Sequence, residues 1–125
     1  MAASIDRLTE EQIAEGLKMH ADWAETGGSI QKTFQFKNFL EAMKFVNRVA
    51  EQAETDQHHP DILVRWNKVT LSLSTHDAGG ISGKDFELAG KADVFAKNYA
   101  PVVVPPPAPA QATGGKSGAG KRGKK

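Results

Sequence analysis

Cysteine is absent from the 125-residue chain. This absence excludes a disulfide framework, a thiol nucleophile and any zinc or iron–sulfur site that needs cysteine ligands. Long apolar runs are missing too, since a run such as 102–104, which is followed by prolines, is far shorter than the roughly 20 residues of a membrane span. The N-terminus lacks the basic and then apolar pattern of a signal peptide. We therefore expect a soluble, cytoplasmic protein with no membrane partner.

Acidic side chains are absent from the last part of the chain. The whole chain has 16 basic and 15 acidic residues; residues 105–125 hold five of the basic ones, which leaves 11 basic and 15 acidic residues in 1–104. This balance of −4 argues against nucleic acid as a partner of the folded part. Residues 105–125 are rich in proline, glycine and lysine and lack large apolar side chains. We predict one domain over 1–104 and a disordered tail over 105–125.

Capping signals predict the first and last of three helices. Thr9 and Gln12 form a capping box in front of apolar residues at helical spacing, which predicts a helix over about 9–21. Ser82 has Asp85 three residues further on, and apolar residues at helical spacing follow. The last helix is therefore expected to begin at Ser82.

Between these two helices, Asn38 begins a predicted helix that extends to about Asp56. Its apolar residues form a continuous stripe, and we expect this stripe to face the core. The stripe consists of Leu40, Met43, Val46, Val49, Ala50 and Ala53.

Alternating apolar and polar residues predict the strands. Residues 29–36 alternate strictly, and a possible short strand at 23–25 precedes them. Strands at 62–66 and 69–73 are expected to form a hairpin with a tight turn at 67–68. Hairpin-linked strands and helices with one apolar side predict an α+β fold, in which helices cover one face of an antiparallel sheet. The core of so small a domain is thin, and we therefore expect a homo-oligomer.

Three of the four histidines lie where the predicted structure changes. His58 and His59 lie between the second helix and the hairpin, and His76 follows the hairpin. Because a hairpin brings the start of one strand beside the end of the next, we expect these three side chains to converge. Histidine supplies both acid and base forms near neutral pH, and the carboxylates of Glu54 and Asp85 lie nearby in the predicted fold. This pattern suits proton transfer.

Other interpretations of these residues stay open. A metal site is disfavoured because the chain has no H-x-x-x-H or H-E-x-x-H pair that would place two nitrogens on one helix face. In a purely structural interpretation, His58 and His59 cap the second helix and His76 is an ordinary strand-end residue. Ser72 and Ser74 are weak candidates for a nucleophile, since no G-x-S-x-G elbow surrounds them.

Several segments with fixed spacing lie within about residues 8–99. They are Glu54-x-x-x-His58-His59-Pro60, Trp66, His76 and Asp85, supported by Phe34-Gln35-Phe36-Lys37, Val49-Ala50-Glu51 and Ser74-Thr75-His76. Together they closely resemble the signature of the pterin-4a-carbinolamine dehydratases. The resemblance implies an α+β fold with a four-stranded antiparallel sheet, helices packed on one face, and assembly as a homodimer or homotetramer.

The resemblance also implies an activity. Members of the family eliminate water from 4a-hydroxytetrahydrobiopterin to give quinonoid dihydropterin, which supports tetrahydrobiopterin recycling, and they use no metal or organic cofactor. Some relatives act instead, or in addition, as binding modules in transcription or in enzyme assembly. A non-catalytic binding function is therefore the alternative.

Roles for individual residues follow from the same resemblance. His58 and His76 correspond to the general acid and base, and His59 corresponds to a residue that binds and orients the pterin. Gln57 replaces an acidic residue that precedes the histidine pair in some relatives. The pocket edge corresponds to Ser74, Thr75 and Asp77, and the supporting carboxylates correspond to Glu54 and Asp85.

Overall fold

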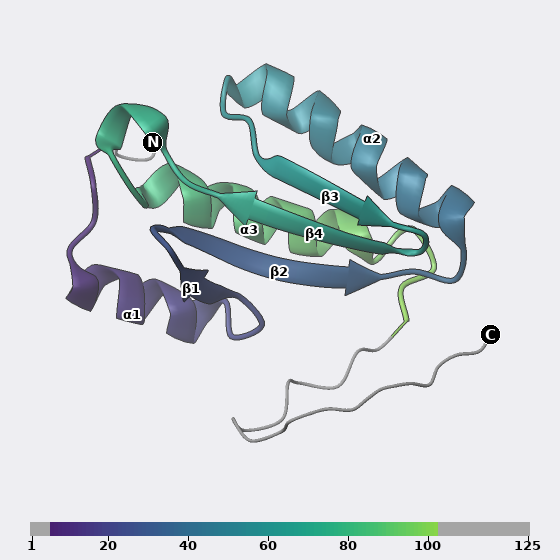
Figure 1. Cartoon of the computed structure of the whole chain (residues 1–125), viewed down its shortest axis with the longest axis horizontal. Coiled ribbons are helices and arrows are strands. Elements are labelled where there is room, and N and C mark those ends of the chain that lie inside the picture. Colours follow the sequence, from purple (N-terminus) through teal and green to yellow (C-terminus); the bar gives the residue numbers. More distant parts are fainter. Residues whose placement is uncertain (1–5, 103–125) are drawn as a thin grey trace.

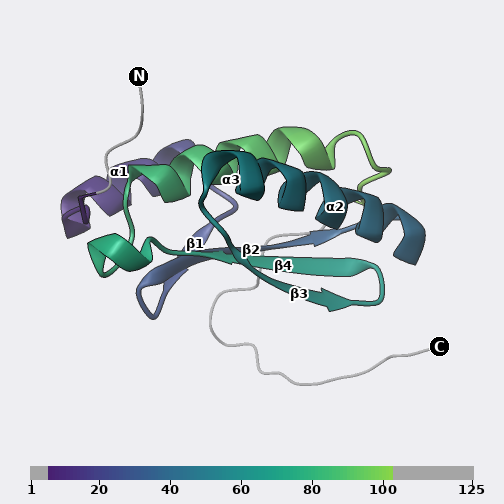
Figure 2. The ribbon, with the colours of Figure 1, turned by 90° about the horizontal axis from the view of Figure 1, so that it is seen from above.

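The computed structural model describes residues 6–102 and arranges them in two layers (Figure 1). In chain order the elements are α1 (Glu10–Met19), β1 (Ala24–Thr26), β2 (Ser29–Gln35), α2 (Phe39–Asp56), β3 (Asp61–Arg65), β4 (Lys68–Leu73), the 3-10 turn η1 (His76–Ala78) and α3 (Gly83–Ala96). The strands form one antiparallel sheet in the order β1-β2-β4-β3. Figure 2 shows the three helices on the same face of this sheet. The α+β class and the one-sided helical layer are thus confirmed.

Each helix begins at the cap that the sequence predicts. The Thr9 hydroxyl accepts the N–H of Gln12, and the Gln12 side chain accepts the N–H of Thr9. Asn38 caps α2 through its side-chain oxygen. Ser82 and Asp85 form a reciprocal box at the start of α3. These bonds satisfy backbone N–H groups that a helix leaves without partners in its first turn.

The core lies between the sheet and the helices. It is built from alternate residues of the strands and from one side of each helix, as the periodicity predicts. The buried apolar residues of the sheet and of α2 and α3 are Ile30, Phe34, Val69, Leu71, Leu73, Ala42, Phe45, Val49, Ala53, Leu88, Ala89, Ala92 and Ala96.

The predicted core stripe of α2 is partly wrong. Leu40 is 69% exposed and Ala50 is exposed, whereas Phe45 is fully buried. The Phe45 ring centroid lies 4.7 Å from that of Phe34 and 5.0 Å from that of Phe36. Apolar residues occur on two neighbouring stripes of α2, and this aromatic cluster decides which stripe faces the sheet.

The turn between β3 and β4 begins one residue earlier than the predicted turn at 67–68. Trp66 and Asn67 form the two-residue loop, so Trp66 is not part of the strand. Trp66 adopts φ +55° and is 69% exposed. This register places Val64 opposite Val69, both on the helix side of the sheet. In this register Trp66 stays exposed in the loop, whereas the predicted turn at 67–68 would pair it with Val69 on the helix side of the sheet.

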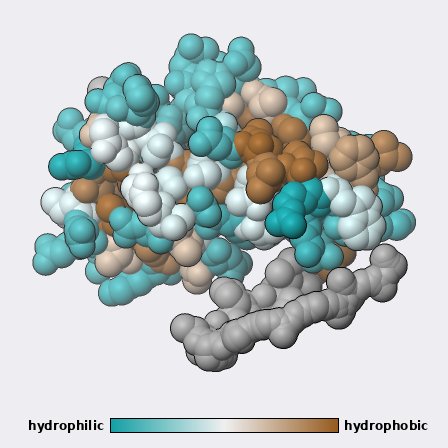
Figure 3. Space-filling model, in the orientation of Figure 1, coloured by the Kyte–Doolittle hydropathy of each residue, from teal (hydrophilic) through white to brown (hydrophobic). Residues whose placement is uncertain are grey.

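The sheet face away from the helices is largely polar. The hydroxyls of Thr33 and Thr70 lie 2.7 Å apart, and Gln31 donates to Ser72 over 3.3 Å. Figure 3 shows pale and teal residues over much of this face, with a brown patch over β3, where Leu63 is exposed, and over the neighbouring end of α2. The polar rows need no second layer to cover them. The thin core remains the basis for expecting a homo-oligomer.

The described chain ends beside β2. The N–H of Val102 donates to the carbonyl of Gln35 over 2.8 Å. Within residues 6–102, no helix is both long enough and apolar enough to cross a membrane. The predicted domain boundary at 104 and the predicted tail over 105–125 lie outside the described residues.

Candidate active site

Three segments that carry predicted site residues meet at one end of the sheet. Asp61, at the start of β3, pairs with Ser72 near the end of β4, so the α2–β3 connection lies beside the β4–η1 connection (Figure 1). His58 comes from the first connection and Thr75 from the second. Both bond to Asp85 in the first turn of α3. Side chains separated by up to 27 residues in sequence thus converge on one carboxylate.

Asp85 is fully buried and has three hydrogen-bond partners. One carboxylate oxygen, Oδ1, lies 2.5 Å from Nε2 of His58. The other, Oδ2, accepts the backbone N–H of Ser82 and the hydroxyl of Thr75, each over 2.9 Å. A buried carboxylate needs such donors. With His58 also acting as a donor, Nε2 carries the proton and Nδ1 is left to act as an acceptor or base.

His58 and His59 point to different surroundings because of the backbone at the end of α2. Gln57 adopts φ +53° as the C-cap, and its side-chain amide donates to the carbonyl of Glu54 over 2.8 Å. His58, only 8% exposed, then turns inward. His59 turns outward, and its Nε2 lies 2.6 Å from Oε2 of Glu54, with both side chains more than half exposed. Gln57 therefore has a local role that the sequence did not reveal.

The residues after β4 divide into an exposed and a buried group. Ser74, His76 and Asp77 are exposed, and no hydrogen bond of the His76 ring occurs within residues 6–102. Thr75 is only 5% exposed, and its hydroxyl is bonded to Asp85. The exposed group can meet a ligand from solution. The Thr75 side chain faces the interior.

An ion pair ties the end of α2 to α3 close to this site. Lys91 approaches Asp56 to 2.9 Å, and Gln52 donates to the same carboxylate over 3.0 Å. Burial alone would raise the pKa of Asp56, but the hydrogen bonds from Lys91 and Gln52 outweigh it and hold this pKa below its ordinary value. The pair helps to fix α2 relative to α3, the two helices that supply Glu54 and Asp85.

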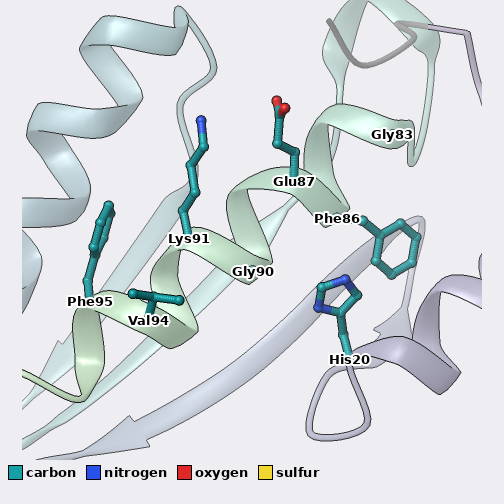
Figure 4. Close-up of a pocket in the computed structure, with 8 residues that line it drawn as sticks. All are labelled: His20, Gly83, Phe86, Glu87, Gly90, Lys91, Val94 and Phe95. Carbon is teal, nitrogen blue, oxygen red and sulfur yellow. The ribbon is translucent and has the colours of Figure 1, made fainter. Parts of the chain in front are cut away.

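A cavity of about 600 Å³ lies elsewhere, along the outer side of α3 (Figure 4). Its side chains are apolar at Phe86, Val94 and Phe95 and titratable at His20, Glu87 and Lys91, and it contains none of the predicted site residues. The ring of His20 stacks on Phe86 there with centroids 5.5 Å apart, so His20 helps to pack α1 against α3. We place the candidate site at His58 and His76 instead, because a histidine is held there by a buried carboxylate, Asp85.

Comparisons with known proteins point to the family that the sequence resembles. A family model described as "Pterin 4 alpha carbinolamine dehydratase" matches residues 6–95. A protein of Picosynechococcus sp. named "Putative pterin-4-alpha-carbinolamine dehydratase" is 51% identical over 87 residues, which are 70% of this chain and 95% of that protein. A protein of the same name from Roseiflexus castenholzii is 54% identical over 86 residues, 69% of this chain and 92% of its own length.

A solved structure has the same fold. The crystal structure of a transcriptional coactivator/pterin dehydratase from Brucella melitensis superposes with a TM-score of 0.71 at 32% sequence identity. The match covers 73% of this chain and 99% of that one. The resemblance found in the sequence is thus supported independently by fold.

Proposed function

Because the chain belongs to the pterin 4 alpha carbinolamine dehydratase family, we propose that it eliminates water from 4a-hydroxytetrahydrobiopterin to give quinonoid dihydrobiopterin. The observation that carries the proposal is the buried hydrogen bond between Nε2 of His58 and Asp85. This bond leaves Nδ1 of the same ring able to accept a proton. The direct test is the dehydration rate of the carbinolamine with purified protein, compared with the spontaneous rate. Equal rates would refute the proposal.

The reaction needs two proton transfers. A base removes the proton from N5 of the pterin, and the electron pair of that bond forms the C4a=N5 double bond. The C4a–O bond breaks with its electrons on oxygen, and an acid protonates the departing hydroxyl to form water. We assign the base to Nδ1 of His58, whose Nε2–H is held by Asp85, and the acid to the exposed His76. Exchange with solvent restores both protonation states.

The Asp85 carboxylate suits this role for His58. When His58 takes the N5 proton, its ring becomes positively charged in a buried position. The carboxylate 2.5 Å away offsets that charge. Before the transfer, the same carboxylate keeps the neutral ring in one tautomer and one orientation. His76 has no such carboxylate within the described residues and relies on its exposure to solvent for the proton that it delivers.

We further propose that His59 binds and orients the pterin and does not transfer a proton. It lies next to His58 on the exposed side, and Glu54 fixes its Nε2, which leaves Nδ1 for a ligand. The exposed Ser74 and Asp77 complete the rim of the proposed pocket.

Replacing His59 with alanine is expected to raise KM for the pterin by about tenfold and to change kcat much less, because the lost contact binds the substrate. Initial rates over a range of pterin concentrations separate the two constants. His20→Ala is the matched control, since His20 lies outside the site and should leave both constants unchanged. A fall in kcat with an unchanged KM would show that His59 takes part in the chemistry.

A second candidate function is a binding role without catalysis. The name of the Brucella melitensis structure couples a transcriptional coactivator with a pterin dehydratase, so one fold is associated with both. If the protein is a binding module, its interactions with partners are expected to persist when His58 and His76 are replaced. The same alternative also predicts no dehydration above the spontaneous rate.

We propose that no metal and no organic cofactor takes part, because the elimination needs only proton transfer. Within residues 6–102, histidine and carboxylate side chains do not form a group of three that could hold a metal ion. Dialysis against a strong chelator is expected to leave kcat and KM unchanged. Loss of activity that added zinc restores would contradict this proposal.

The remaining proposals concern the cellular setting. We propose a cytoplasmic homodimer or homotetramer with a small pterin as its substrate. A molar mass by light scattering at several protein concentrations distinguishes these assemblies from a monomer. The proposed boundary at 104 predicts that truncation there leaves the assembly intact.

A further inference from the structure

Two buried hydroxyls lie behind the candidate site, and the proposed reaction does not use them directly. Thr75 follows β4 and precedes His76, and Ser82 caps α3. Thr75 is 5% exposed and Ser82 is fully buried. Their hydroxyl oxygens lie 2.6 Å apart. At this distance the two hydroxyls share one hydrogen bond. Because both are buried, their remaining hydrogen-bonding capacity is expected to be met by other groups of the protein.

The hydrogen bonds around these hydroxyls run in one direction. A hydroxyl has a single hydrogen to donate, and Thr75 donates it to Oδ2 of Asp85 over 2.9 Å. The Ser82 hydroxyl must therefore be the donor to Thr75. Ser82 accepts in turn from the backbone N–H of Lys84 over 3.2 Å. The chain of bonds thus starts at the α3 backbone and passes through Ser82 and Thr75 to Asp85.

We propose that Thr75 and Ser82 are positioning residues that hold the Asp85 carboxylate in place and so fix which nitrogen of His58 carries the proton. The inference rests on the proposed dehydratase function and deepens it. Oδ2 of Asp85 is held by Thr75 and by the Ser82 N–H, which leaves Oδ1 directed at Nε2 of His58.

The backbone of Thr75 also fixes the position of the other proposed proton-transfer residue, His76. The N–H of Thr75 donates to the carbonyl of Gly80 over 2.8 Å, and its carbonyl accepts from the N–H of Ala78 over 3.0 Å. His76 lies inside this closed loop. The Thr75 side chain therefore bonds to Asp85, which holds His58. The Thr75 main chain bonds to Gly80 and Ala78, which close the loop that contains His76.

Thr75→Val keeps the shape of the side chain and removes the hydroxyl. It is expected to lower kcat by about tenfold with little change in KM, because Asp85 loses one of its three donors while no substrate contact is lost. A Thr75 side chain that bound the pterin directly would instead raise KM. Thr75→Ser restores a hydroxyl and is expected to recover most of the wild-type kcat.

The tautomer of His58 provides a readout that does not depend on turnover. Nitrogen NMR of the imidazole ring in the full-length protein is expected to show one tautomer, protonated at Nε2, in the wild type and a mixture in Thr75→Val. The matched control is Thr70→Val, which removes a hydroxyl from the Thr33–Thr70 pair on the polar sheet face. This control is expected to leave both the tautomer and kcat unchanged.

A wild-type kcat and a single unchanged tautomer in folded Thr75→Val would overturn the inference. If that variant does not fold, Ser82→Gly replaces it, since glycine is tolerated at an N-cap and the substitution removes the bond to Thr75. Like Thr75→Val, it is expected to lower kcat and to give a mixture of His58 tautomers. A wild-type kcat with a single unchanged tautomer would also overturn the inference. An inactive wild type would refute the dehydratase function, whereas the tautomer measurement would still test the positioning roles.

Discussion

Replacing His58 or His76 with alanine is expected to lower kcat for dehydration by about 10² or more. Each substitution removes one of the two groups proposed to move a proton, and bulk water would have to act in its place. The kcat of each variant is measured by following the pterin absorbance after rapid mixing with freshly formed carbinolamine. The spontaneous rate, measured without protein, sets the lower limit.

The two histidines need different controls because they differ in burial. His76 is exposed, so its replacement should leave the free energy of unfolding within about 0.5 kcal/mol of the wild type. His58 is buried on Asp85, and alanine there leaves a carboxylate oxygen without its donor. His58→Gln is the matched variant, because its side-chain amide can donate to Asp85 but cannot transfer protons near neutral pH. Near-normal turnover in both folded alanine variants would contradict the assignment.

The segments that carry the histidines could be placed side by side from the sequence, but the hydrogen bonds of these residues could not. A hairpin places the start of β3 beside the end of β4 whatever the rotamers are, and the pairing of Asp61 with Ser72 confirms this. That the side chains of His58 and His76 converge stays a prediction. The inward direction of the Thr75 side chain depends on its contact with Asp85 of α3. The left-handed backbone of Gln57 depends on where α2 ends. The role proposed for Ser82 could not be predicted, because a serine at a helix N-cap gives the same sequence pattern whether or not its hydroxyl also bonds to another side chain.

The same division applies to the fold. Caps such as Thr9, Asn38 and Ser82 are decided by residues within one turn, and all three are confirmed. The loop at Trp66 and the buried side of α2 are decided by contacts between distant segments. Hydrophobic periodicity identified α2 as an amphipathic helix, but it could not distinguish two neighbouring apolar stripes.

Phe45→Ala is expected to lower the free energy of unfolding by about 3–5 kcal/mol. Phe45 is fully buried and packs against the rings of Phe34 and Phe36, so truncation leaves a cavity that rigid strands cannot fill. A loss of this size is a large part of the roughly 5–15 kcal/mol that stabilises a typical domain. It also loosens α2, whose Ala53 carbonyl accepts the N–H of His58 over 3.0 Å. Urea unfolding curves with matching slopes measure the loss.

Leu40→Ala on the same helix provides the matched comparison. Leu40 belongs to the stripe that the sequence predicts as core, yet it is 69% exposed, and its truncation is expected to change the unfolding free energy by no more than about 0.5 kcal/mol. A larger loss in Leu40→Ala than in Phe45→Ala would mean that α2 presents the other stripe to the sheet. If the protein assembles through the patch around Leu63 and the start of α2, Leu40→Ala would weaken the assembly instead. The concentration dependence of unfolding separates that effect from the stability of the single chain, since an interface contribution grows with protein concentration and a core contribution does not.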